Sequence, residues 1–209
     1  MHRTLVMLLA ALVLLPAAAA GRSPATPDNE LQLGLGWSQA LESGVFNVPD
    51  DVEGGSALGF EFAYYKNLSA AVAVGVHFFG YSATLEDIQL LGAGGEELAV
   101  DFDLTTYDLG ARLRWTFLRG VVSPYAYAGV GWVTGEVEGA GVGSLQHDGF
   151  GISGGCGAAL FASPYIGFAI EALLSTGWSN WDTPPFLNSD SDDFDPGMFG
   201  ILGAIVLRF

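Results

Sequence analysis

Alternation of bulky apolar residues with small or polar ones is the feature that most constrains how this chain can fold. In residues 31–38, three leucines and a tryptophan occupy every second position, and Gln, Gly and Ser fill the positions between them. The same period of two recurs, in chain order, in 58–65, 71–78, 106–117, 124–133, 150–160, 166–178 and the last residues up to Phe209. A period of two is typical of strands and not of helices. The sequence therefore predicts an all-β chain with eight strands.

The two faces of these segments differ in polarity. One face is bulky and apolar, and the other consists of Gly, Ala, Ser and a few charged residues. A soluble eight-stranded barrel would place its apolar side chains inside and its charges outside. Hydrophobic residues make up 50% of the chain, yet no segment after residue 20 is an apolar run long enough for a membrane helix. We therefore expect an antiparallel up-and-down transmembrane β-barrel of eight strands, with the bulky face toward lipid and a narrow lumen.

The connections between the expected strands alternate between short and long. Short turns are expected at 66–68, 118–122 and 163–164, and long loops at 41–55, 81–103, 134–148 and 179–197. Most acidic residues fall in the long segments, whereas Lys66 and Arg119 lie at short turns. Transmembrane barrels place their short turns in the periplasm, so we expect the acidic loops to be extracellular.

Aromatic residues of the bulky face gather near the two ends of the expected strands. Trp37, Phe78, Trp132, Phe150, Trp178 and Phe199 lie toward the long loops, and Tyr64, Trp115, Phe117 and Phe209 toward the short turns. Two such groups are typical of the two interfaces of a membrane.

The N-terminal segment has the pattern of a secretory signal peptide. His2 and Arg3 supply a basic start, and the apolar run 5–15 is too short to span a bilayer. Ala18 and Ala20 match the small-residue cleavage pattern. We expect residues 1–20 to be removed, with a retained anchor as the alternative. Residues 21–30 are expected to be a flexible leader before a barrel of residues 31–209.

Two stretches carry a resemblance to a known family, namely 123–132 (SPYAYAGVGW) and 203–209 (GAIVLRF). On these residues, and over about 31–209, the chain resembles the small outer-membrane β-barrel domain proteins of Gram-negative bacteria, of the OmpA/OmpX type. The resemblance implies an integral outer-membrane location. With Phe209 taken as the C-terminus, it also implies that Ile205, Leu207 and Phe209 form the assembly signal read by the barrel-assembly machinery. The family is functionally diverse, so the resemblance implies no particular activity.

The small-residue face carries charges of both signs. They are Glu61, Asp108 and Glu171 against Arg112, Arg114 and Arg208. Counting from the short turns places Glu61, Arg112, Arg114 and Glu171 at a similar depth. Because an isolated charge in a narrow lumen is costly, we expect these four to form a luminal ion cluster that closes the barrel. The alternative is that each arginine extends separately toward water at the periplasmic mouth.

Few other residues are candidates for catalysis or metal binding. His77 is expected to point into the lumen, and His147 to lie in a loop near Asp148 and Ser144. A lipid A-modifying hydrolase built on such residues is the least favoured function, and we expect no enzyme activity and no cofactor. The acidic stretch 190–197 lacks the ligand order of an EF-hand, so a solvated loop is favoured over a calcium site.

The net charge and the cysteine count exclude some classes of partner and site. A net charge of −16 argues against nucleic acid, which requires a basic surface. Cys156 is the single cysteine, which excludes an internal disulfide and multi-cysteine metal sites, and it is expected to face lipid. We expect a structural or surface-interaction barrel in contact with outer-membrane lipid and lipopolysaccharide, with an unidentified extracellular partner. A small channel for ions or apolar solutes is the alternative.

Overall fold

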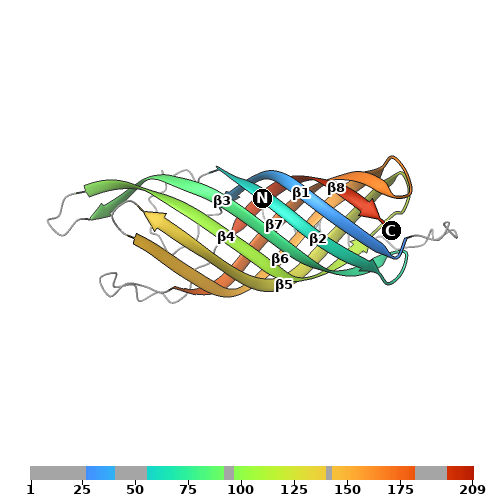
Figure 1. The fold of residues 1–209 in the computed structure, drawn as a ribbon, viewed down its shortest axis with the longest axis horizontal. Helices are drawn as coiled ribbons and strands as arrows, with labels where there is room; N and C mark the ends of the chain where they lie inside the picture. The colour runs from blue at the N-terminus through green and yellow to red at the C-terminus, as the bar shows by residue number, and fades with distance from the viewer. Residues whose placement is uncertain (1–26, 41–55, 92–96, 140–142, 182–196) are drawn as a thin grey trace, which may run out of the picture.

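Eight antiparallel strands close into one barrel (Figure 1). The computed structural model describes residues 27–40, 56–91, 97–139, 143–181 and 197–209. The strands are β1 (Asn29–Ala40), β2 (Ser56–Asn67), β3 (Val72–Leu91), β4 (Glu97–Thr116), β5 (Val122–Gly139), β6 (Gly143–Phe161), β7 (Ile166–Trp181) and β8 (Met198–Arg208). Each strand pairs with the next, and β8 returns to pair with β1. The predicted fold class is confirmed.

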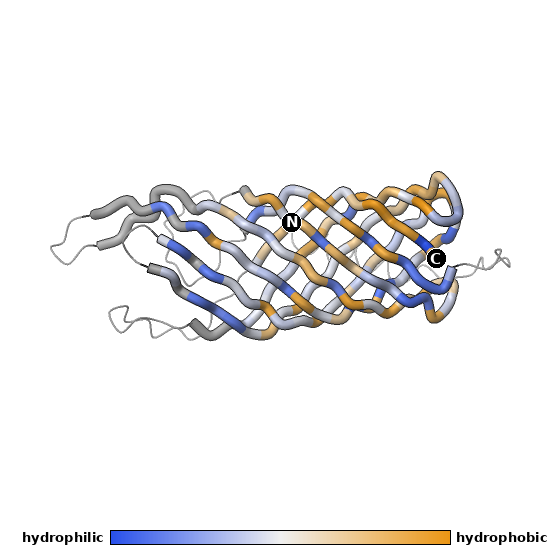
Figure 2. The backbone as a smooth tube through the Cα atoms, in the orientation of Figure 1, coloured by the Kyte–Doolittle hydropathy of each residue, from blue (hydrophilic) through white to orange (hydrophobic). Residues whose placement is uncertain are grey.

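The predicted inside and outside faces are also confirmed. Outward apolar side chains are widely exposed, as at Ile170 (70%), whereas the inward Leu202 is fully buried (0%). Figure 2 shows how apolar residues alternate with more polar ones along the strands. Cys156 faces outward and is exposed, as expected. No helix in the described part of the chain is long and apolar enough to cross a membrane.

The three short turns lie at one end of the barrel, at 68–71, 117–121 and 162–165. Serine side chains hold two of them. The Ser69 hydroxyl accepts hydrogen bonds from the backbone N–H groups of Ala71 and Val72, and Ser163 does the same for Tyr165 and Ile166. Such local side-chain bonds favour turns over continued strands.

The prediction of long loops at 81–103 and 134–148 is wrong, because strands β3 to β6 continue through most of both segments. Only residues 92–96 and 140–142 of these segments lie outside the described residues. The expected loops at 41–55 and, for the most part, 179–197 also lie outside them. Strands β3 to β6 therefore reach far beyond β1, β2 and β8 at the end opposite the short turns (Figure 1).

The outward face of the barrel wall becomes polar in these strand extensions. Inward residues there include the apolar and buried Tyr81, Ala83 and Leu104, while the outward face becomes polar and exposed, as at Thr84 and Asp103. Thr84 Oγ1 donates to Asp103 Oδ1 across the β3–β4 pair at 2.9 Å. A strand with one apolar and one acidic face is stable in water, so the acidic residues do not require a loop.

An outward aromatic row marks where this change occurs. Trp132, Phe150 and Trp178 lie directly opposite one another on β5, β6 and β7. One step further from the short turns, the outward positions on β5 and β6 are Thr134 and Asp148. The row fits the membrane interface predicted from the aromatic residues.

Strand β1 begins two residues earlier than expected. Asn29 and Glu30, assigned to the leader from the sequence, are strand residues, and the Asn29 N–H donates to the carbonyl oxygen of Phe209 at 3.0 Å. The expected signal peptide, 1–20, and leader residues 21–26 lie outside the described residues.

Candidate functional site

Glycines make room for large side chains in the narrow lumen. A Cβ added at Gly75 would lie 2.6 Å from the Tyr65 ring, and one added at Gly110 would lie 2.8 Å from Cε1 of His77. In both cases a large inward side chain lies over a glycine of the neighbouring strand. The glycine face predicted from the sequence therefore makes room for large inward side chains.

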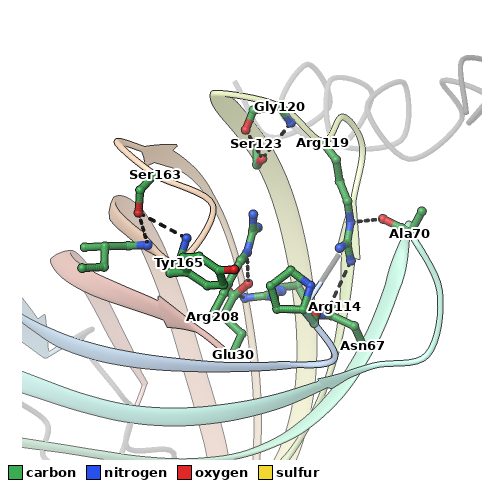
Figure 3. Close-up of polar contacts among 12 residues, drawn as sticks. Glu30, Asn67, Ala70, Arg114, Arg119, Gly120, Ser123, Ser163, Tyr165 and Arg208 are labelled. Atoms are coloured by element: carbon green, nitrogen blue, oxygen red, sulfur yellow. Dashed lines mark hydrogen bonds and ion pairs between the residues drawn. The ribbon is translucent and has the colours of Figure 1, made fainter. Parts of the chain in front are cut away.

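One group of charges lies at the mouth near the short turns (Figure 3). Glu30 accepts from Arg114 Nη1 at 2.5 Å and from Arg208 Nε at 3.0 Å. The Arg114 guanidinium also stacks on Tyr65, 4.0 Å from the ring centroid, and that of Arg208 lies over Phe161. We call Glu30, Arg114 and Arg208 the mouth cluster.

Beside the mouth cluster, Arg119 connects two of the short turns by hydrogen bonds (Figure 3). Its guanidinium donates to Asn67 Oδ1 and to the backbone carbonyls of Ser69 and Ala70. These bonds join the turn after β4 to the turn between β2 and β3 and so stiffen this end of the barrel.

A second group fills the middle of the lumen. Glu61 accepts from Arg112 Nη1 and, at 3.1 Å, from Gln32 Nε2. The same Gln32 nitrogen donates to Glu171 at 2.7 Å. Glu171 also accepts the hydroxyl groups of Tyr125 (2.8 Å) and Tyr127 (3.0 Å). We call Gln32, Glu61, Arg112, Tyr125, Tyr127 and Glu171 the central network.

The structure divides the four residues of the expected ion cluster between these groups. It brings Glu61, Arg112 and Glu171 together, but Arg114 pairs with Glu30 at the mouth. Glu171 is held by neutral donors, among them Gln32. Glu30 escapes prediction because its position falls in the expected leader. Gln32 escapes prediction because a neutral residue on a polar face carries no charge signal.

Further from the short turns, the lumen changes from polar to apolar. His77 Nε2 lies 3.2 Å from Asp108 Oδ2, and both residues are buried, so His77 is luminal as expected. Beyond this pair, Phe79, Leu173, Met198 and Leu202 are inward and almost fully buried. We call these four residues the apolar layer.

The residues considered for hydrolysis do not form a catalytic group. His147 lies on β6 rather than in a loop, and it is inward and 1% exposed, with Thr106 Oγ1 3.4 Å from its Nε2. Ser144 is exposed and donates to Glu136 on the neighbouring strand, and Asp148 faces outward. The predicted loop position of His147 is therefore wrong. The candidate calcium residues 190–196 lie outside the described residues.

Ile205, Leu207 and Phe209 lie at the β8 end of the barrel seam. Ile205 and Phe209 are exposed and Leu207 is half-buried, in keeping with their outward phase. Their role as an assembly signal stays a prediction.

These features define a class of protein. A closed eight-stranded barrel with a lipid-compatible outer face, an aromatic row and a charged, packed lumen is an integral membrane β-barrel. The sequence model of the Outer membrane protein beta-barrel domain family matches residues 7–201. The chain belongs to this family and is an integral protein of the bacterial outer membrane. No curated protein sequence matches it.

Solved structures share the fold at low sequence identity. Neisserial surface protein A (NspA) is similar with a TM-score of 0.58 and 13% identity, over 89% of this chain and 100% of that one. OprG from Pseudomonas aeruginosa has a TM-score of 0.52 and 13% identity, over 88% and 99% of the two chains. A major outer membrane protein from Thermus thermophilus has a TM-score of 0.50 and 14% identity, over 87% and 99%. At these identities, the likeness shows the fold alone.

Proposed function

We propose that this protein is a structural, surface-interacting barrel of the outer membrane whose lumen does not conduct ions. The observation that carries the proposal is the filling of the lumen. The mouth cluster, the central network and the apolar layer succeed one another along the barrel, and nearly all of their side chains are buried. A selective pore would instead need a continuous polar path lined by exposed side chains.

Outward acidic residues on β4 and β5, including Asp101, Asp103 and Glu138, are exposed beyond the aromatic row. We infer that this end is extracellular, where it contacts lipopolysaccharide and partners at the cell surface. The short turns, with Lys66 and Arg119, then lie in the periplasm, as in other transmembrane barrels.

Conductance tests the closed lumen. We expect the refolded protein to show no stable openings in planar bilayers, because arginines, carboxylates and the apolar layer fill the lumen. A matched variant should conduct: Arg112→Ala, Tyr127→Ala and Leu202→Ala together remove large luminal side chains and leave the outer face unchanged. Stable wild-type openings comparable to those of the variant would overturn the proposal.

Cysteine labelling tests the orientation. In a Cys156→Ser background, we expect Glu138→Cys to react with a membrane-impermeant maleimide on intact cells and Gly120→Cys to react only after lysis. Both positions are exposed, and a Cβ at Gly120 would meet no atom closer than 3.8 Å, so neither change should disturb folding. Labelling of Gly120→Cys, but not Glu138→Cys, on intact cells would reverse the assignment.

A further inference from the structure

Apolar side chains are exposed on all three short turns. Leu68 lies in the first turn, Leu118 and Val121 in the second and Tyr165 in the third, with exposed fractions of 60–68%. Large apolar side chains gathered on one exposed surface are typical of contact with a protein or a membrane. The turn end of the barrel is therefore a candidate contact surface.

The length of the apolar outer wall places these turns at the edge of the membrane. Ten residues separate Trp132 from Val122 on β5, and ten separate Phe150 from Leu160 on β6. The outward residues between them are all apolar or glycine. At about 3.3 Å per residue and a strand tilt of about 40°, each wall is about 25 Å high, which is the height of the lipid-facing band of a transmembrane barrel. The turns then lie at the level of the phospholipid headgroups.

Cationic side chains outnumber carboxylates at this end, although the whole chain carries a net charge of −16. Among the described residues, the cations are Lys66, Arg114, Arg119 and Arg208, and the carboxylates are Asp28 and Glu30. The balance stays positive when a carboxylate at Phe209 is counted. An anionic group from outside the chain would reduce this excess of positive charge.

Arg119 supplies a donor for such a group. In the described part of the chain its guanidinium bonds only to neutral oxygens, those of Asn67, Ser69 and Ala70 (Figure 3). Its Nη1 has no hydrogen-bond partner there. Burial and the nearby guanidinium group of Arg208 lower the pKa of Arg119, so the surroundings disfavour its charge. An anionic acceptor at Nη1 would satisfy the donor and offset the repulsion.

We propose that Arg119 binds the phosphate group of an anionic phospholipid, with Leu118 and Val121 in contact with the glycerol and acyl region of the same lipid. A lipid fits better than an acidic peptide, because cationic and apolar side chains lie together at headgroup level. The assignment to the inner leaflet rests on the orientation proposed above. The binding test below does not depend on orientation or conductance, so failure of either proposal can be recognised separately.

Native mass spectrometry of the full chain, refolded in a non-ionic detergent, tests the proposal. The protein is titrated with phosphatidylglycerol and, separately, with phosphatidylcholine of the same acyl chains, whose choline group cancels the phosphate charge. We expect the first phosphatidylglycerol to bind about tenfold more tightly, as a charge-assisted hydrogen bond implies. Equal affinities would overturn the proposal, and this wild-type comparison needs no variant to fold. Displacement of the lipid by equimolar inorganic phosphate would assign the site to the free ion instead and would also overturn it.

Two matched variants separate a defined site from general attraction between charges. Arg119→Met removes the proposed donor, so the affinity for phosphatidylglycerol should fall about tenfold. Lys66→Met removes one cation from the same end, but Lys66 is exposed and its contacts are solvated, so the affinity should fall about twofold or less. Heat-modifiable gel mobility checks that both variants fold. Equal losses in the two folded variants would contradict the assignment to Arg119.

Discussion

Replacing Arg112 with methionine is expected to destabilise the barrel by about 3–5 kcal/mol, because the change leaves a buried carboxylate without its cation. Glu61 and Arg112 are each 3% exposed, so solvent does not replace the lost partner. Within the described part of the chain, the remaining donor to Glu61 is Gln32 Nε2 at 3.1 Å, and that nitrogen is already shared with Glu171. Methionine keeps much of the side-chain volume, so the loss reports mainly on charge and hydrogen bonding.

Urea unfolding of protein refolded in lipid vesicles, followed by tryptophan fluorescence, measures this free energy. The Glu61→Gln/Arg112→Met double variant should be more stable than Arg112→Met, because it removes the stranded charge. Lys66→Met is the control, since Lys66 is exposed near the end of β2 and should change stability by about 0.5 kcal/mol or less. The expectation fails if Arg112→Met and Lys66→Met have the same cost.

Gly36→Ala is expected to destabilise the barrel by about 3 kcal/mol, because the added methyl group collides with the backbone of the closing strand. Gly36 lies on β1 opposite Leu202 of β8. Its Cβ would lie 2.7 Å from the Leu202 Cα and 2.9 Å from the Ile201 carbonyl carbon, and closer still to the Ile201 oxygen. Backbone atoms of a paired strand can give way only if the β1–β8 seam moves apart.

Gly200→Ala is the matched control on the same seam. Gly200 is also inward, and its Cβ would meet its nearest neighbours, at Trp37 and Ser38, at 3.5 and 3.6 Å, which is ordinary contact. We expect this change to be neutral or slightly stabilising, because alanine restricts the unfolded chain more than glycine does. The folded fraction is read from heat-modifiable gel mobility and the free energy from urea titration. Equal stability of the two alanine variants would contradict the steric reason given for Gly36.

Alternation, together with the polarity of the two faces, determined which side chains point inward, and this explains why the face assignments hold. In a strand, neighbouring side chains must lie on opposite sides, so Glu61, Arg112 and Glu171 could be placed in the lumen without any tertiary information. Strand length could not be read in the same way. The acidic residues of 81–103 and 134–148 suggested loops, yet an acidic face is equally compatible with a strand that extends into water.

The identity of the luminal partners depended on the tertiary structure. Arg114 was expected to join Glu61 and Glu171, but closure of the β1–β8 seam places Glu30 and Arg208 beside it. Counting residues from turns gives depth along each strand. It does not give the stagger between strands, which decides the neighbours around a barrel. The sequence by itself thus determined the class of fold, the membrane-facing surface and the charged interior. Register and closure decided which charges meet, because these depend on pairings between residues far apart in the chain.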